Sequence, residues 1–212
     1  MGASFPWTIK CIREIAPKTV EVSCTLGDMP NLPGSVSLAA TGAATLGVNY
    51  IKVSLLSYQT EKEAEYILQN VVKAVKSQDK HTRVVAAGFA DAKRVGSINP
   101  LLVPRIASVA KCDYAMVDTA IKDDKTLFDF FDPVKLKTFV DDTHGYGLKV
   151  ALAGSLQVEH LPVLCGLGVD IAGLRGSACT NKDRKNGHIT KQKVQKLVQA
   201  IKAAENSLVA VR

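Results

Sequence analysis

The 212-residue sequence has no long hydrophobic run and no secretory leader. A bilayer-spanning helix needs roughly 18 or more consecutive apolar residues, and no stretch of this chain approaches that length. Met1 is not followed by the basic and then apolar regions of a signal peptide. We therefore predict a cytoplasmic protein that does not bind a membrane.

Cysteine and histidine are sparse, and neither shows a metal-binding pattern. The five cysteines lie far apart with no C-x-x-C pair, and the four histidines have no ligand spacing. Scattered cysteines in a reducing compartment are more often small buried hydrophobic residues than metal ligands, so metal ligation is the less favoured alternative. The cysteines are Cys11, Cys24, Cys112, Cys165 and Cys179.

Aromatic residues make up only 6% of the chain, and its positive charge is not gathered into a stripe. Nucleic-acid binding favours a basic surface interleaved with aromatic side chains, so we predict no nucleic-acid partner. The net charge of +7 fits attraction of a small anionic substrate such as a phosphate ester. The alternative is a solvated basic surface with no binding role.

The sequence does contain short apolar runs that alternate with amphipathic segments, a pattern of βαβ units around a parallel sheet. Linkers and low-complexity stretches are absent, so residues 1–212 are predicted to form a single domain. The expected strands are Thr19–Thr25, Tyr50–Ser54, Arg83–Gly88, Tyr114–Asp118, Lys149–Ala153 and Asp170–Leu174. The expected helices between them include Lys62–Lys76, Pro100–Ala110, Pro133–His144 and Val158–Leu167.

The two ends of this pattern indicate the fold. The chain opens with a predicted helix at Phe5–Ile15 and closes with one at Lys191–Asn206, with about six strands between them. A (β/α)8 barrel has eight strands and typically about 250 residues. We therefore predict an α/β fold, a TIM-type (β/α) barrel that is incomplete at the N-terminus.

Charged residues occur where two predicted strands would open into the barrel. The apolar run Tyr114–Val117 stops at Asp118, and Lys122 follows four residues later. Catalytic groups of parallel α/β proteins sit at the carboxyl ends of strands, because only that end is open. An acid and an amine at this position favour proton transfer or carbonyl chemistry. A structural salt bridge at the rim of the barrel is the alternative.

Lys52 lies inside the short apolar strand Tyr50–Ser54. Its side chain must point into the barrel, where an amine can act as a base or attack a carbonyl, or else snorkel to the rim. Asp91, at the end of the run Ala86–Asp91, is a weaker candidate. A helix N-cap would explain that residue equally well.

Two glycine-containing turns follow the last two predicted strands. Gly154 and Ser155 follow one strand, and Arg175, Gly176 and Ser177 follow the other. Barrels often bind phosphate at this place through backbone N–H groups, and an arginine adds a charge-assisted contact. Each turn alone would be an ordinary turn signal, but their joint position predicts a phosphate site.

Together these segments resemble the (5-formylfuran-3-yl)methyl phosphate synthase family over nearly the whole chain. Such long joint motifs are specific. The segments that carry the resemblance are Ser23–Asp28, Pro33–Ala40, Tyr50–Val53, Val84–Asp91 with Arg94–Ser97, Asp118–Asp129, Val150–Ser155 and Gly173–Ala178.

The resemblance implies a TIM barrel that condenses two molecules of glyceraldehyde 3-phosphate into a phosphorylated furan aldehyde, a precursor of methanofuran-type carriers. Phosphate and water are released. It implies a lyase with a small phosphorylated aldehyde as substrate and with no metal or organic cofactor. By position, Lys52 matches the proton acceptor, and Asp118 and Lys122 match the acidic and basic groups around the substrate.

One family feature has no counterpart. The resemblance implies a Schiff-base lysine in an Asp-Val-Lys-Asn-Pro-like stretch before a Gly-Ala-x-Phe-Pro-Trp helix. In this sequence that helix begins at Gly2–Trp7, so no Schiff base is expected at the family position. A six-stranded barrel also leaves two unpaired edges, a known route to association. We expect a homo-oligomer whose partner covers the gap, or a native form that begins upstream.

Three hypotheses follow from the residues and the resemblance. The first is a synthase of the family type. The second is another phosphosugar aldolase or lyase that uses Lys52 or Lys122. The third is a catalytically impaired or non-catalytic relative that still binds phosphate esters.

Overall fold

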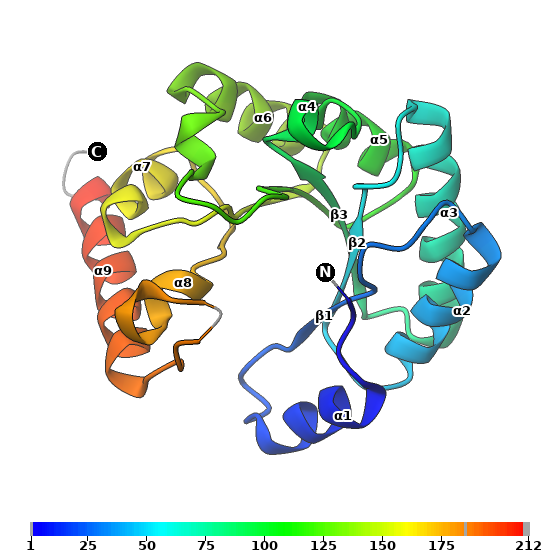
Figure 1. Cartoon of the computed structure of the whole chain (residues 1–212), viewed down its shortest axis with the longest axis horizontal. Helices are drawn as coiled ribbons and strands as arrows, with labels where there is room; N and C mark the ends of the chain where they lie inside the picture. The colour runs from blue at the N-terminus through cyan, green and yellow to red at the C-terminus, as the bar shows by residue number, and fades with distance from the viewer. Residues whose placement is uncertain (1, 185, 210–212) are drawn as a thin grey trace.

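Six parallel strands form one curved sheet, and helices cover its outer side (Figure 1). The computed structural model describes residues 2–184 and 186–209. The strands are β1 (Ser23–Thr25), β2 (Tyr50–Ser54), β3 (Arg83–Phe89), β4 (Tyr114–Asp118), β5 (Lys149–Leu152) and β6 (Ile171–Ala172). The longer helices are α1 (Pro6–Ile15), α2 (Pro33–Ala44), α3 (Glu61–Gln78), α5 (Val103–Val109), α6 (Pro133–Gly145), α7 (Leu161–Gly166) and α9 (Lys191–Val209). The short helical turns are α4 (Ala92–Val95), α8 (Arg175–Ala178), η1 (Pro100–Leu102), η2 (Leu127–Asp129), η3 (Val158–His160) and η4 (Thr180–Lys182).

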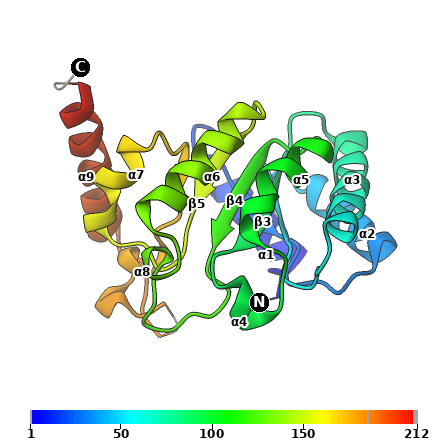
Figure 2. The same cartoon turned by 90° about the horizontal axis from the view of Figure 1, so that it is seen from above.

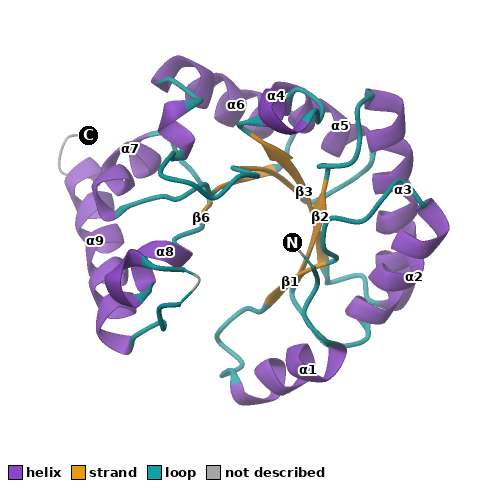
Figure 3. Cartoon of the chain, viewed as in Figure 1, coloured by secondary structure: helices purple, strands orange, loops and turns teal. Residues whose placement is uncertain are grey.

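The strands lie side by side in chain order, β1 to β6, and every pair is parallel. Parallel neighbours need a crossover, and the helix after each strand supplies it. The sheet curls but does not close: Figure 3 shows an opening between β1 and the region of β6 and α8. Among the described residues, β1 and β6 each pair on one side only. The predicted fold, an incomplete (β/α) barrel, is confirmed.

Local sequence explains where several helices begin. Proline occupies the first turn of α1, α2 and α6, where its missing N–H leaves no hydrogen bond unmade. The start of α3 carries a capping box, in which Thr60 and Glu63 bond each other's backbone N–H. Among the described residues, no helix is long and apolar enough to cross a membrane.

The strands alternate between two cores. One set of side chains, including Ile51, Val53 and Val117, packs outward against the helices. The other set faces the inside of the curl and contains Tyr50, Val85, Ala87, Tyr114, Met116, Ala151 and Ala153. Because side chains alternate along a strand, Lys52 and Ser54 share the inner face with Tyr50. The side chains of Lys52 and Ser54 therefore point toward the inside of the barrel.

The amino ends of the strands are tied together by a repeated hydrogen bond. Three times, an Asn or Asp just before one strand accepts the N–H at the start of the preceding strand. The residue two positions earlier has a positive φ each time: Gly47 (72°), Lys111 (60°) and Gly168 (77°). The hydrogen-bonded pairs are Asn49 with Val22 N (2.8 Å), Asp113 with Val84 N (2.7 Å) and Asp170 with Val150 N (2.8 Å).

A charged cluster at the same end closes the inside of the curl. The Tyr50 hydroxyl donates to Glu21 (2.5 Å) and accepts from Arg83, whose guanidinium also pairs with Glu21 at 2.7 Å. The Tyr50 ring meets the Tyr114 ring edge-on at 5.5 Å. Burial and the bond to Glu21 raise the pKa of Tyr50 well above its ordinary value. We call this cluster of Glu21, Tyr50, Arg83 and Tyr114 the floor of the barrel.

Candidate active site

A cavity of about 970 Å³ opens at the carboxyl ends of the strands. Its lining comes from residues in or just after β1, β2, β3, β4 and β5 and from the loops beyond β6. Figure 2 shows α4 and α8, which follow β3 and β6, at the same end of the sheet. All of the predicted site residues except Ser177 line this cavity. They are Lys52, Asp118, Lys122, Gly154, Ser155, Arg175 and Gly176.

Lys52 is half-buried in the middle of β2, on the inner face of the sheet. Its ammonium makes no hydrogen bond or ion pair with any residue that the structure describes, so it is available to a ligand in the cavity. Cys24 also lines the cavity. Burial raises the pKa of the Cys24 thiol to about 11, and nearby Lys52 opposes that rise only in part. Cys24 is therefore held as a neutral thiol.

Asp118 and Lys122 form a close ion pair at the end of β4. The Lys122 ammonium lies 2.5 Å from Asp118 Oδ1 and 3.1 Å from Thr119 Oγ1. The Thr119 N–H also donates to Asp118 Oδ1, at 2.7 Å. The side chains of Lys122 and Asp118 are 17% and 28% exposed, which leaves both groups open to the cavity. This geometry offers a substrate one proton donor and one acceptor side by side.

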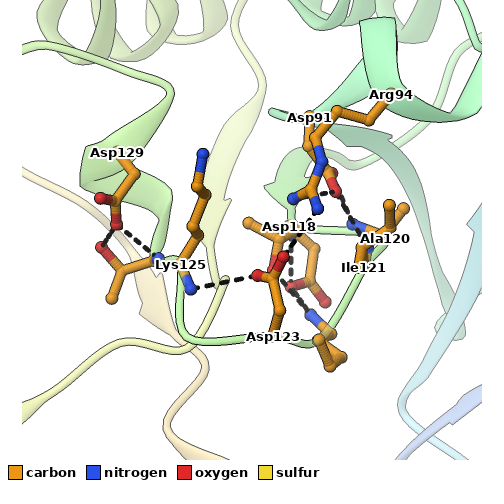
Figure 4. A network of polar contacts seen from close by, with 11 residues as sticks. Asp91, Arg94, Asp118, Ala120, Ile121, Asp123, Lys125 and Asp129 are labelled. Carbon is orange, nitrogen blue, oxygen red and sulfur yellow. Dashed lines mark hydrogen bonds and ion pairs between the residues drawn. The ribbon is translucent and has the colours of Figure 1, made fainter.

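The loop that carries Lys122 is held by Asp91 and Arg94, which follow β3 (Figure 4). Asp91 accepts hydrogen bonds from the backbone N–H groups of Ala120 and Ile121. Asp123 pairs with Arg94 at 2.7 Å, and the hydrogen bond from Arg94 lowers the pKa of Asp123. Asp91 stands at the N-cap position of α4 but makes no capping bond. Asp91 thus occupies the N-cap position that the sequence offered as the alternative, but its carboxylate bonds the loop after β4 and not the N–H groups of α4.

Gly154 and Ser155 form a tight turn after β5. Both have a positive φ, 116° at Gly154 and 50° at Ser155. A Cβ at Gly154 would lie 3.0 Å from Thr119 Cγ2 and 3.2 Å from Leu127 Cβ, so only glycine fits there without strain. The turn packs directly against the end of β4, and its backbone faces the same cavity as the Asp118–Lys122 pair.

Arg175 and Gly176 belong to α8 and line the cavity from the β6 side. Ser177, in the same short helix, lies outside that lining. Its hydroxyl donates to the Leu156 carbonyl at 2.7 Å, and it borders a separate hollow of about 240 Å³. The structure therefore brings together the other four residues of the predicted phosphate site and places the Ser177 side chain in a tether between two loops.

The cavity is also lined by basic residues that do not belong to the predicted site. Lys182 and Arg184 line it from the irregular segment after α8. Lys182 has a positive φ of 56°, and a sequence does not indicate this conformation at a residue other than glycine. Within the described residues, no group of three or more His, Cys, Asp or Glu side chains is placed to hold a metal ion.

Comparison with known proteins gives a consistent family match. The model of the 4-HFC-P synthase family matches residues 1–198. A protein of Methanocaldococcus jannaschii named (5-formylfuran-3-yl)methyl phosphate synthase is 54% identical over 202 residues, covering 95% of this chain and 86% of the relative. A protein of the same name from Methanococcus aeolicus is 52% identical over 199 residues, covering 94% of this chain and 85% of that relative.

Solved structures support the fold at much lower sequence identity. An aldolase, QR15, superposes with a TM-score of 0.62 at 16% identity, covering 80% of this chain and 74% of that one. A 3-hexulose-6-phosphate synthase gives a TM-score of 0.61 at 15% identity, covering 94% of this chain and 80% of that one. At these identities the likeness concerns the barrel architecture alone.

Proposed function

This chain belongs to the 4-HFC-P synthase family, and we propose that it condenses two molecules of glyceraldehyde 3-phosphate into a phosphorylated furan aldehyde. The product would be (5-formylfuran-3-yl)methyl phosphate, the compound for which its relatives are named. Inorganic phosphate and water leave in the reaction. The enzyme is of the lyase type and serves the biosynthesis of a methanofuran-type carrier.

One observation carries the proposal: an amine that has no partner among the described residues and an acid–amine pair face a single cavity. Lys52 comes from β2, and Asp118 and Lys122 come from the end of β4. The cavity of about 970 Å³ lies at the upper end of the roughly 300–1,000 Å³ usual for small-molecule sites. That size suits a site that holds two small substrates together.

The residues fit the proton transfers that such a condensation needs. A base must remove a proton from the carbon next to one aldehyde, and a donor must stabilise the charge that develops on its oxygen. We assign the first role to the Lys52 amine, which takes up the proton. Lys122 donates to the substrate oxygen, and Asp118 orients Lys122 and returns protons in later steps.

We assign the phosphate group to the turns after β5 and β6. The backbone of Gly154 and Ser155 approaches the cavity without a side chain at Gly154, and Arg175 adds a guanidinium from the other side. Gly176 keeps the approach to the backbone open, while Ser177 fastens the β6 turn to the β5 loop. Backbone N–H groups and arginine are suited to bind phosphate oxygens.

Incubation with glyceraldehyde 3-phosphate tests the reaction. The proposal predicts a furan aldehyde, detected by its ultraviolet absorbance and mass, together with release of inorganic phosphate. A different carbonyl product would instead indicate a phosphosugar aldolase or lyase. Binding of glyceraldehyde 3-phosphate without turnover would indicate a non-catalytic phosphate-ester-binding relative.

The covalent step needs its own test, because the Schiff-base lysine that the family resemblance implies is expected before Gly2, outside the 212-residue sequence. A lysine amine that attacks the aldehyde releases water and forms an imine, which borohydride reduces to a stable secondary amine. Trapping in the presence of glyceraldehyde 3-phosphate, followed by peptide mass mapping, identifies the lysine. An adduct on Lys52 or Lys122 with furan product assigns the covalent step to that residue. Furan product without any adduct would contradict a Schiff-base mechanism.

We also propose that the chain forms a homo-oligomer. The outer edges of β1 and β6 carry no described neighbour, and Phe5 and Trp7 at the start of α1 are 65% and 68% exposed and stack on each other. Unpaired strand edges and exposed aromatic side chains favour association. Sedimentation of the purified chain tests this, and a monomer at all concentrations would contradict it.

A further inference from the structure

Asp91 is the one charged side chain buried in the core among the residues that the structure describes. Its carboxylate has no exposed surface and follows the end of β3. A buried carboxylate is costly unless it is paired and hydrogen-bonded. It is not among the described residues that line the cavity, so it does not act on a substrate directly. Its place must be explained by the groups that it contacts.

Those contacts lie in the loop after β4. Asp91 Oδ1 accepts the Ala120 N–H at 2.6 Å, and Oδ2 accepts the Ile121 N–H at 2.9 Å. Two consecutive backbone donors therefore converge on a single carboxylate, one on each oxygen, as Figure 4 shows. The ends of β3 and β4 are also joined by the Ala90 N–H and the Asp118 carbonyl, at 2.7 Å. Asp91 thereby fixes the path of the chain immediately beyond Asp118.

That path determines where Lys122 points. Ala120 and Ile121 lie between Asp118 and Lys122, and the chain must turn there for the Lys122 ammonium to reach Asp118 at 2.5 Å. Among the described residues, the Ala120 and Ile121 N–H groups have no hydrogen-bond acceptor other than Asp91. Asp91 therefore acts on Lys122 through the backbone.

A second contact holds the far side of Lys122. Arg94 pairs with Asp123 at 2.7 Å and lies 3.9 Å from Asp91. The Arg94 guanidinium thus offsets the negative charge of the buried Asp91 and also anchors the residue directly after Lys122. The two ends of the short segment 120–123 are fixed to the same pair of side chains, Asp91 and Arg94.

We propose that Asp91 is a positioning residue for the Asp118–Lys122 pair, and that it sets the geometry of proton transfer at the mouth of the barrel. We call the contacts of Asp91 with Ala120 and Ile121, together with the Arg94–Asp123 pair, the clamp. The effect of the clamp on turnover rests on the proposed function, but the clamp itself is a property of the folded chain. Misplacing a catalytic group by about 1 Å can cost on the order of 100-fold in rate. Loosening the clamp should therefore lower kcat more than it raises KM.

Asp91→Asn is the direct test. The asparagine keeps the shape of the side chain but presents an amide NH2 to one of the two N–H groups, so one hydrogen bond is replaced by a repulsion. We expect kcat for furan formation to fall by roughly 10- to 100-fold, with KM for glyceraldehyde 3-phosphate changed by less than about threefold. An unchanged kcat would overturn the proposal.

Asp113→Asn is the matched control. Asp113 also accepts a backbone N–H, that of Val84 at 2.7 Å, but it does so at the opposite end of the sheet. Its loss should lower the unfolding midpoint without changing kcat. If both variants lost turnover in proportion to their lost stability, the role of Asp91 would be structural only, and the proposal would be wrong.

A readout without turnover separates this proposal from the proposed function. The rate at which an amine-reactive reagent labels Lys122, measured by peptide mass mapping, should rise in Asp91→Asn and stay unchanged in Asp113→Asn. The labelling of Lys52 serves as the internal standard. Faster labelling of Lys122 in a chain that makes no furan would keep the clamp and refute the synthase activity. Equal labelling in wild type and Asp91→Asn would refute the clamp.

Should Asp91→Asn fail to fold, Asp123→Asn provides a second variant. It weakens the pair with Arg94 from the exposed side of the loop, where the Asp123 side chain is 36% exposed. The same selective rise in Lys122 labelling is expected at smaller size. No change in either labelling or kcat would overturn the proposal.

Discussion

The charged side chains at the amino ends of the strands, in the floor, differ in their contacts from those at the carboxyl ends, which form the mouth of the barrel. At the floor, Glu21, Tyr50 and Arg83 satisfy one another. At the mouth, Lys52 has no hydrogen-bond or ion-pair partner among the described residues, and Asp118 and Lys122 are paired but open to the cavity. Tyr50 and Lys52 lie only two positions apart on β2, yet Tyr50 is hydrogen-bonded within the protein and Lys52 faces the cavity without such a partner among the described residues.

This difference assigns a task to each end. Hydrogen bonds that are complete and confined to the protein contribute to stability, whereas an amine left available at the carboxyl end of parallel strands can serve a ligand. The repeated Asx contacts at Asn49, Asp113 and Asp170 occur only at the amino end of the described strands. Substitutions should therefore separate stability from activity according to the end they touch.

Among substitutions outside β2, loss of Lys122 should have the largest effect on turnover. Lys122→Ala removes the donor beside Asp118, and positioned proton transfer contributes on the order of 10²- to 10⁴-fold in rate. The matched control is Lys125→Ala in the same loop, since the Lys125 ammonium lies over the Phe130 ring at 5.6 Å and is not among the described lining residues. Steady-state kinetics of both variants should show the loss in the first alone. Equal rates for the two would remove Lys122 from the mechanism.

A charge placed in the β5 turn should come next. Ser155→Asp puts a carboxylate beside the proposed phosphate position, and aspartate tolerates the positive φ of 50° found there. Repulsion should raise KM roughly 10- to 100-fold, with a smaller change in kcat. Ser155→Asn, which has the same shape without the charge, controls for size. If the two variants bind glyceraldehyde 3-phosphate with the same affinity, the turn has no role in phosphate binding.

The smallest effect concerns the floor at acid pH. The hydrogen bond from Tyr50, followed by that from Arg83, lowers the pKa of Glu21 below 4.5. A depressed carboxyl pKa stabilises the folded state above the unfolded pKa, and this contribution is lost as the pH falls through the folded value. As the pH falls below 4.5, the free energy of unfolding of the Glu21→Gln variant should therefore decrease less than that of the wild type. If urea unfolding gave the same decrease in free energy for both proteins over that pH range, this assignment would be contradicted.

The sequence predicted the central strands well because their signal is local. The bounds of β2 and β4 agree with the expected Tyr50–Ser54 and Tyr114–Asp118. Their uninterrupted apolar residues, each run ended by a polar side chain, are typical of a strand covered on both faces. Where the sheet ends, the prediction was less accurate: β6 is only Ile171–Ala172, and among the described residues it has a partner strand on one side only.

The helix α2 has a weak signal in the sequence for a physical reason. Its residues are mostly small, Gly, Ser and Ala among them, and they show no clear apolar stripe. Such a helix is specified by close packing against a neighbour, here α3, and not by its own periodicity. The sequence marks only its start, at Gly34 and Ser35 after a loop rich in proline and glycine, and that start agrees with the structure.

The site was predicted where residues sit at strand ends and missed where the contacts are long-range. Lys52, Asp118 and Lys122 follow from strand position alone, and the structure places all three on one cavity. The link from Asp91 to Ala120 and Ile121 spans about 30 residues of sequence. Only the pairing of β3 with β4 brings these residues together, so no local pattern signals the clamp.

The most direct test compares two variants of one strand, Lys52→Ala and Tyr50→Phe, by turnover of glyceraldehyde 3-phosphate and by the free energy of unfolding. Lys52→Ala should lose on the order of 10²- to 10⁴-fold in turnover with near-normal stability. Tyr50→Phe should lose about 1–2 kcal/mol of stability, since it deletes hydrogen bonds to Glu21 and Arg83, with near-normal turnover. Variants that lose activity and stability together, or a Lys52→Ala enzyme with normal turnover, would contradict the division between floor and mouth.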